Sequence, residues 1–184
     1  MAQFERSEEE TIQAIKDWWK ENGRAVIAGV LLGIGGIVGV RYWFDAQQQS
    51  RQQASQLYSE VLMATQTGNR EEAGERVGTL TQEYAATVYA PLAALALARL
   101  ELEAGQPEQA ERHLRWALDN SDTQEYRHLA RQRLARLLLA GGQPQQAADL
   151  LKDIDEGGYA SIYAEIRGDI EVAREQPGDA RGHY

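Results

Sequence analysis

The 184-residue sequence has no cysteine and only three histidines. The missing cysteines exclude disulfides, iron–sulfur clusters, zinc sites built from thiolates, and thiol nucleophiles. His113 and His128 fall in different predicted helices and His183 in the C-terminal tail, and no two of them have the His-x-x-x-His spacing of a helical zinc site. We therefore expect solvated histidines on helix faces, and no metal or cofactor.

Positive charge is also in deficit. The chain carries 19 Lys and Arg against 28 Asp and Glu, and residues 45–184 alone carry 14 against 22. Binding to nucleic acid, or lying on anionic lipid, needs a basic surface, so both functions are disfavoured. Serines are few and indicate no Ser/His/Asp set. The composition predicts that the protein is not an enzyme.

One long apolar run occupies residues 25–44, AVIAGVLLGIGGIVGVRYWF, and residues 25–40 carry no charge. Twenty helical residues span about 30 Å, the thickness of a bilayer's hydrocarbon core. We predict one transmembrane helix over 25–44. A cleaved signal peptide is disfavoured because bulky and charged residues follow the run, without a small-x-small site. A buried helix of a soluble domain is disfavoured because such helices seldom lack a polar face for this long.

Aromatic and basic residues flank the run and are expected at the membrane interface: Trp18, Trp19, Arg41, Tyr42 and Trp43. Residues 1–24 form a short segment in which apolar residues recur at helical spacing. It is either an amphipathic helix that lies at the interface or docks a cytosolic partner, or an aromatic belt with a solvated lead-in. Asn22-Gly23 is expected to break the helix before the membrane.

Lysine and arginine near the two ends of the run favour one orientation. Lys16, Lys20 and Arg24 lie close to its N-terminal end, against Arg41 and Arg51 beyond the other end. The bias places the N-terminus in the cytoplasm, as in a type II protein. Residues 45–56 are polar and rich in glutamine, which suits a helical stalk that continues the anchor.

Small residues recur in the membrane helix at helical spacing. Gly29, Gly33 and Gly36 fall on one face, which would let a second helix approach closely. The second helix would be a copy of this chain or a membrane partner. Glycine is also common in membrane helices generally, so both interpretations stay open.

The region after residue 57 repeats itself. Gly68-Asn69, Gly105-Gln106 and Gly142-Gln143 follow one another at intervals of 37 residues, each with an alanine four residues after the second of the pair, and a weaker fourth copy begins at Gln176. Such a period is that of tetratricopeptide-type helical solenoids. Strand signals are scarce, since Thr87-Val88-Tyr89 is too short. The prediction is an all-α protein with one N-terminal transmembrane helix followed by an α-solenoid.

Each repeat is expected to be a helix ended by glycine, a tight turn, and a second helix whose first turn suits proline. We predict helices near 50–67, 71–84, 88–104, 107–119, 123–140, 144–153 and 159–175. An eighth begins near Gly178, so the last hairpin of the domain 57–184 is expected to be incomplete.

Stacked hairpins form a concave groove lined mainly by the first helix of each pair. Tetratricopeptide geometry predicts these inward residues: Leu95, Arg99, Leu102, Gln132, Arg136, Glu165 and Asp169. Their mixture of cationic and apolar side chains suits an extended peptide or a partner helix. Alternatively, several of them form the core between hairpins.

Two short motifs carry a resemblance. Glu21-Asn22-Gly23-Arg24, the glycine-rich anchor and Arg41-Tyr42-Trp43 resemble the YfgM family of Gram-negative bacteria, as does the order of segments. Leu134-Ala135-Arg136 and Ile166-Arg167-Gly168 in the repeats are similar but less specific. Family members look longer at the C-terminus.

The resemblance implies a type II inner-membrane protein whose repeat domain is periplasmic. It further implies an ancillary subunit of the SecYEG translocon that works with PpiD and other periplasmic chaperones on client polypeptides. The cytoplasmic end of the family has also been connected to a stress-response regulator. Two alternatives remain beside this adaptor: a self-associating membrane scaffold, and a membrane-anchored regulator.

Overall fold

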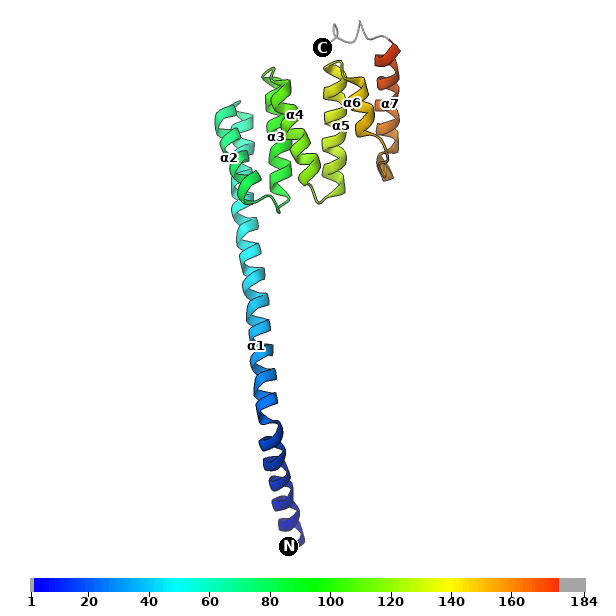
Figure 1. The fold of residues 1–184 in the computed structure, drawn as a ribbon. Coiled ribbons are helices and arrows are strands. Elements are labelled where there is room, and N and C mark those ends of the chain that lie inside the picture. Colours follow the sequence, from blue (N-terminus) through cyan, green and yellow to red (C-terminus); the bar gives the residue numbers. More distant parts are fainter. Residues whose placement is uncertain (1, 176–184) are drawn as a thin grey trace. The chain divides into compact units, whose positions relative to one another are not determined.

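The computed structural model describes residues 2–175, and helices are the regular secondary structure of that range (Figure 1). The chain divides into two compact units, residues 1–49 and residues 50–184. The helix α1 (Ala2–Gln66) belongs to both: its first part makes up unit 1, and its end opens unit 2.

Unit 1 contains the predicted membrane helix. α1 is the one described helix that is long and apolar enough to cross a membrane. Its large apolar side chains between Ile27 and Val40 are all exposed, so none of the residues that the structure describes covers them. The all-round apolar surface is typical of a helix in lipid.

The predicted helix break at Asn22-Gly23 is wrong, because α1 continues through both residues. The Asn22 side-chain amide donates to the Trp18 carbonyl at 3.1 Å, so it supports the helix. Gly23 is buried under the Trp19 ring, where a Cβ atom would come within 3.2 Å of the indole. Glycine at this position therefore makes room for a tryptophan one turn away.

Unit 2 is built from the end of α1 and six further α-helices of the described chain: α2 (Arg70–Glu83), α3 (Tyr89–Glu103), α4 (Pro107–Asn120), α5 (Gln124–Ala140), α6 (Pro144–Leu150) and α7 (Ala160–Glu175). The 3₁₀ turn η1 (Gly157–Tyr159) leads into α7. Neighbours in sequence pack on each other, as in a helical solenoid, and α7 packs on both α5 and α6.

The three glycines of the repeat end helices as predicted. Gly68, Gly105 and Gly142 have φ angles of 71°, 72° and 70°, a left-handed conformation that glycine adopts without strain. After each, the next residue's N–H donates to the carbonyl five residues back, as from Gln106 to Glu101 at 2.8 Å. This is the Schellman pattern, and it turns the chain into the second helix of each hairpin.

The repeated alanines lie where the two helices of a hairpin cross. Ala73, Ala110 and Ala147 are fully buried, and Val77, Leu114 and Leu151 follow them into the core. Two buried clusters result. One joins α1, α2 and α3, and the other joins α3 to α7. The residues that recur every 37 positions in the sequence are thus the residues that form the core.

The helix boundaries match the prediction closely, apart from two. The predicted first helix, 50–67, is the end of α1, and α6 ends at Leu150 instead of 153. Beyond α6, Asp153 adopts a positive φ of 52°, which is incompatible with continuing a helix. The eighth predicted helix, near Gly178, lies outside the described residues.

Candidate functional site

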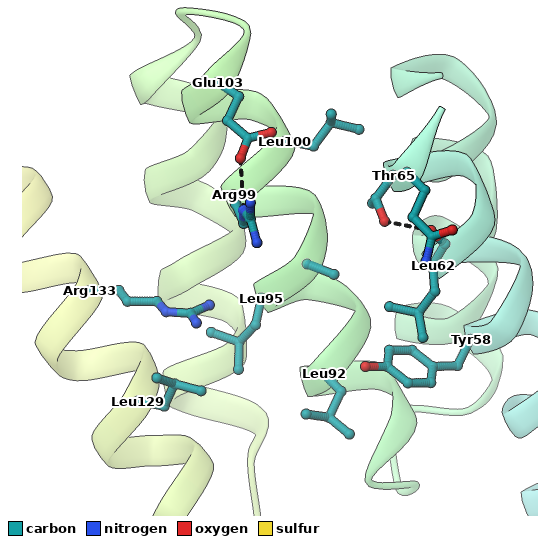
Figure 2. Close-up of a pocket in the computed structure, with 12 residues that line it drawn as sticks. Tyr58, Leu62, Thr65, Leu92, Leu95, Arg99, Leu100, Glu103, Leu129 and Arg133 are labelled. Carbon is teal, nitrogen blue, oxygen red and sulfur yellow. Dashed lines mark hydrogen bonds and ion pairs between the residues drawn. The ribbon is translucent and has the colours of Figure 1, made fainter. Parts of the chain in front are cut away.

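A pocket of about 360 Å³ opens on unit 2 between three helices: the end of α1, α3 and α5. These are the first helices of successive hairpins, as expected for a solenoid groove. Figure 2 shows their side chains converging on it from both sides. The residues that line it are Tyr58, Leu62, Thr65, Gln66, Leu92, Leu95, Ala96, Arg99, Leu100, Glu103, Leu129 and Arg133.

The pocket has an apolar wall formed by leucines of α1, α3 and α5. Leu95 is 3% exposed and belongs to the core, whereas Leu92 and Leu129 are half-buried. Tyr58 completes the wall, with its ring 5.8 Å from that of Tyr89. Burial raises the pKa of the Tyr58 phenol, so the hydroxyl stays neutral at physiological pH.

The charged side of the pocket holds two arginines and one glutamate. Arg99 Nε donates to Glu103 at 2.7 Å, one turn further along α3. Within the described residues, the Arg133 guanidinium makes neither a hydrogen bond nor an ion pair. Partial burial and the charge of Arg99 lower the pKa of Arg133, which still stays protonated. The pocket therefore presents one uncompensated cation beside apolar side chains.

The structure separates the seven predicted groove residues into three groups. Leu95 and Arg99 line the pocket. Arg136 of α5 and Glu165 of α7 form an exposed ion pair at 3.3 Å. Leu102 and Asp169 are exposed and Gln132 is half-buried, and none of these three lines the pocket.

Sequence reasoning missed the α1 side of the pocket and Arg133. A signal for the first was present, because stepping back 37 residues from Leu95 and Arg99 reaches Tyr58 and Leu62. The same step forward from Leu92 reaches Leu129. Arg133 is equivalent to Ala96 by this rule, so the repeat alone gives no sign of a cation there.

The expectation of exposed histidines is wrong for His128, which is 5% exposed. Its Nδ1 lies 2.6 Å from the Tyr163 hydroxyl. Glu125 precedes His128 at Glu-x-x-His spacing, but its side chain is exposed and Nδ1 of the ring already contacts Tyr163. No group of three His, Asp or Glu side chains in the described chain is placed to hold a metal ion.

In unit 1, the residues predicted at the membrane interface are all exposed: Trp18, Trp19, Arg41, Tyr42 and Trp43. Gly29, Gly33 and Gly36 have open space where a Cβ atom would stand. No described part of the chain packs on this glycine face. The face is therefore available to another helix.

Comparison with known proteins gives matches that extend over both units. A family model described as a tetratricopeptide repeat-like domain matches residues 16–184. An ancillary SecYEG translocon subunit of Haemophilus influenzae is 31% identical over 167 residues, covering 91% of this chain and 81% of its own length. The chain belongs to the family of ancillary SecYEG translocon subunits.

Other members of the family are similar over the same extent. The ancillary SecYEG translocon subunit of Escherichia coli is 29% identical over 96% of this chain, and that of Aggregatibacter actinomycetemcomitans is 30% identical over 96%. None of these names denotes a catalytic activity, in agreement with the prediction that the protein is not an enzyme. No solved structure matches the chain significantly.

Proposed function

We propose that this protein is an inner-membrane adaptor that stands beside the SecYEG channel and links it to periplasmic chaperones through its repeat domain. The observation that carries the proposal is the similarity to ancillary translocon subunits over more than nine-tenths of the chain, spanning both the apolar helix and the repeats. An apolar helix supplies a place in the membrane, and a solenoid supplies a surface for polypeptides.

The proposed topology has residues 1–24 in the cytoplasm, residues 25–44 in the membrane, a stalk at 45–56 and the repeat domain at 57–184 in the periplasm. The excess of Lys and Arg before residue 25 supports this orientation. A C-terminal reporter that is active only in the periplasm tests it. Activity of the opposite, cytoplasmic reporter would instead favour a membrane-anchored regulator whose repeats face the cytosol.

Crosslinking in native membranes tests the adaptor function. A photoreactive residue in place of Val38 in the apolar run is expected to capture translocon membrane subunits. A second, in place of the exposed Leu102 of α3, is expected to capture periplasmic chaperones or client polypeptides. If both positions yield only copies of the chain itself, the adaptor proposal fails and a self-assembling scaffold replaces it.

The glycine face supports self-association as a second candidate. Gly29, Gly33 and Gly36 are open to an approaching helix, and small residues at this spacing allow close helix contact in lipid. Such contact would serve either a homodimer or docking on a channel subunit. The two functions are therefore compatible, and the same glycines enter both.

A further inference from the structure

We infer that the pocket between α1, α3 and α5 binds an extended polypeptide segment by one aliphatic side chain and one neighbouring glutamate or aspartate, whose carboxylate pairs with Arg133. This inference rests on the proposed adaptor function and names the chemistry of the polypeptide that the repeat domain would hold. It follows from three features of the pocket: an unpaired cation, an apolar wall and an open path.

The cation is the first feature. Unit 2 is acidic, and its other pocket arginine, Arg99, is already paired with Glu103 at 2.7 Å. Arg133 is left without a partner of opposite charge within the described residues and beside the like charge of Arg99. Figure 2 shows its side chain reaching from α5 towards α3, beside Leu95. A carboxylate placed there would gain charge-assisted hydrogen bonds and relieve the repulsion between the two arginines.

The apolar wall is the second feature. Leu92, Leu129 and the ring of Tyr58 surround a space of about 360 Å³, within the roughly 300–1,000 Å³ of typical ligand pockets. The Tyr58 hydroxyl makes no hydrogen bond within the described residues, so it remains able to bind a backbone carbonyl of the occupant. An aliphatic side chain on one side of Arg133 is the chemistry that matches this wall.

Glu103 limits how much negative charge the occupant can carry. Its carboxylate lines the pocket and neutralises Arg99, so the two arginines together offer one net positive charge. A second carboxylate on the occupant would face Glu103 at close range. We therefore expect a single acidic residue flanked by apolar or neutral ones, and poor binding of acidic runs.

The third feature, the open path, concerns whether the bound carboxylate belongs to a side chain or to the C-terminus of the occupant. Beyond Arg133, the exposed Arg136–Glu165 pair links α5 to α7 without burying either side chain. A polypeptide can thus pass along the first helices of the hairpins instead of stopping in the pocket. For this reason the inference commits to an internal glutamate or aspartate.

Fluorescence anisotropy with the full chain in nanodiscs of neutral lipid tests the inference. The probe is a labelled nonapeptide of alternating leucine and serine with one central glutamate, acetylated and amidated to remove its terminal charges. Its partner peptide has glutamine in place of the glutamate. We expect the glutamate peptide to bind about tenfold more tightly, the value of one charged hydrogen-bonded pair.

Two variants locate the effect. Arg133→Gln should abolish the difference between the two peptides, and Arg112→Gln should leave it intact. Arg112 is exposed on α4 outside the pocket, and its substitution changes the net charge by the same amount. Since Arg133 makes no hydrogen bond or ion pair with the residues described, we expect Arg133→Gln to keep the parent melting temperature.

Three results would overturn the inference. The first is equal binding of the two peptides, and the second is an equal loss of the glutamate preference in both variants. The third is binding only of an additional peptide, the glutamine peptide with its C-terminal carboxylate left free. The adaptor function is separable from it. If the parent chain crosslinks to the translocon but shows no preference for the glutamate peptide, the pocket inference fails alone. If the preference is present but no translocon crosslink forms, the adaptor proposal fails alone.

Discussion

His128 and Tyr163 meet in the core between α5 and α7, with the ring nitrogen Nδ1 2.6 Å from the phenolic oxygen. Tyr159 stacks on the imidazole, its ring centroid 4.3 Å away. Both partners come from the last described helix and the turn before it. A buried polar contact therefore fixes α7, the last described helix, onto the repeat that precedes it.

The stability of unit 2 should fall in acid because His128 is buried. Burial, and then the charge of Arg131, lower the pKa of His128, against smaller opposing effects of Asp155 and Glu125. The unfolded chain then binds the proton more tightly than the folded chain. The contribution of His128 to the free energy of unfolding should be complete above pH 6.5, the ordinary pKa of histidine. It should be lost as the pH falls from there towards the lower pKa of the folded state. Urea unfolding of the full chain in detergent, followed by circular dichroism between about pH 8 and 5, measures this slope.

Replacing His128 by Gln should reduce the dependence of unfolding free energy on pH, whatever it does to the stability at neutral pH. The pKa of His113 is also lowered by burial, so part of the slope should persist in this variant and disappear in a double variant with His113→Gln. Tyr163→Phe should cost about 1 kcal/mol at neutral pH, since the ring nitrogen loses its partner. An unchanged slope in the double variant would contradict the assignment to these histidines.

A buried acid in the second hairpin gives another test. Glu101 is 8% exposed and pairs with Arg70 of α2 at 3.2 Å, although Ala64 and Leu138 occupy the equivalent positions of the neighbouring repeats. Arg70→Gln should destabilise the protein by about 1–3 kcal/mol, because the carboxylate loses its cationic partner. Glu101→Leu should stay within about 1 kcal/mol of the parent or exceed it, because an apolar side chain replaces a desolvated ion.

The control is Lys152→Gln, since Lys152 pairs with Asp149 on an exposed surface. Its cost should stay below about 0.5 kcal/mol. Chemical denaturation of the three variants decides the matter. If Glu101→Leu is the most damaging of the three, the buried ion pair has a stabilising role that burial alone does not explain.

The repeat period predicted the architecture well because the same residues do the same work in each hairpin. Gly105 had to end a helix and Ala110 had to sit at a crossing, and local chemistry decides both. Arg133 and His128 were not predictable in this way. Their environments depend on residues outside their own helix: Arg99 of the preceding repeat and Tyr163 of the following one. They also depend on the packing angle between neighbouring hairpins. Gly23 shows the same limit in unit 1: a residue expected to break the helix lies within it, beneath the Trp19 ring.

The glycine turns allow a matched pair of substitutions. Gly105 has a φ of 72°, so Gly105→Ala should cost about 1 kcal/mol through strain alone. Gly74 lies within α2, with open space at its Cβ position, so Gly74→Ala should stabilise by about 0.5–1 kcal/mol. Thermal unfolding of the two variants should move in opposite directions. A shift in the same direction would show that the turn is not constrained as described.

The glycine face of the membrane helix should control association in the bilayer. Gly29→Ile combined with Gly33→Ile puts branched side chains where a second helix would approach, and should abolish helix–helix contact. Gly35→Ile adds the same kind of side chain on another side of the helix and serves as the control. Energy transfer between labelled full-length chains in vesicles measures self-association, and crosslinking to channel subunits measures docking. If only self-association is lost, the face is assigned to a homodimer, and if only docking is lost, it is assigned to the channel. If both self-association and docking persist, the face is only lipid-exposed and the repeat domain carries the contacts.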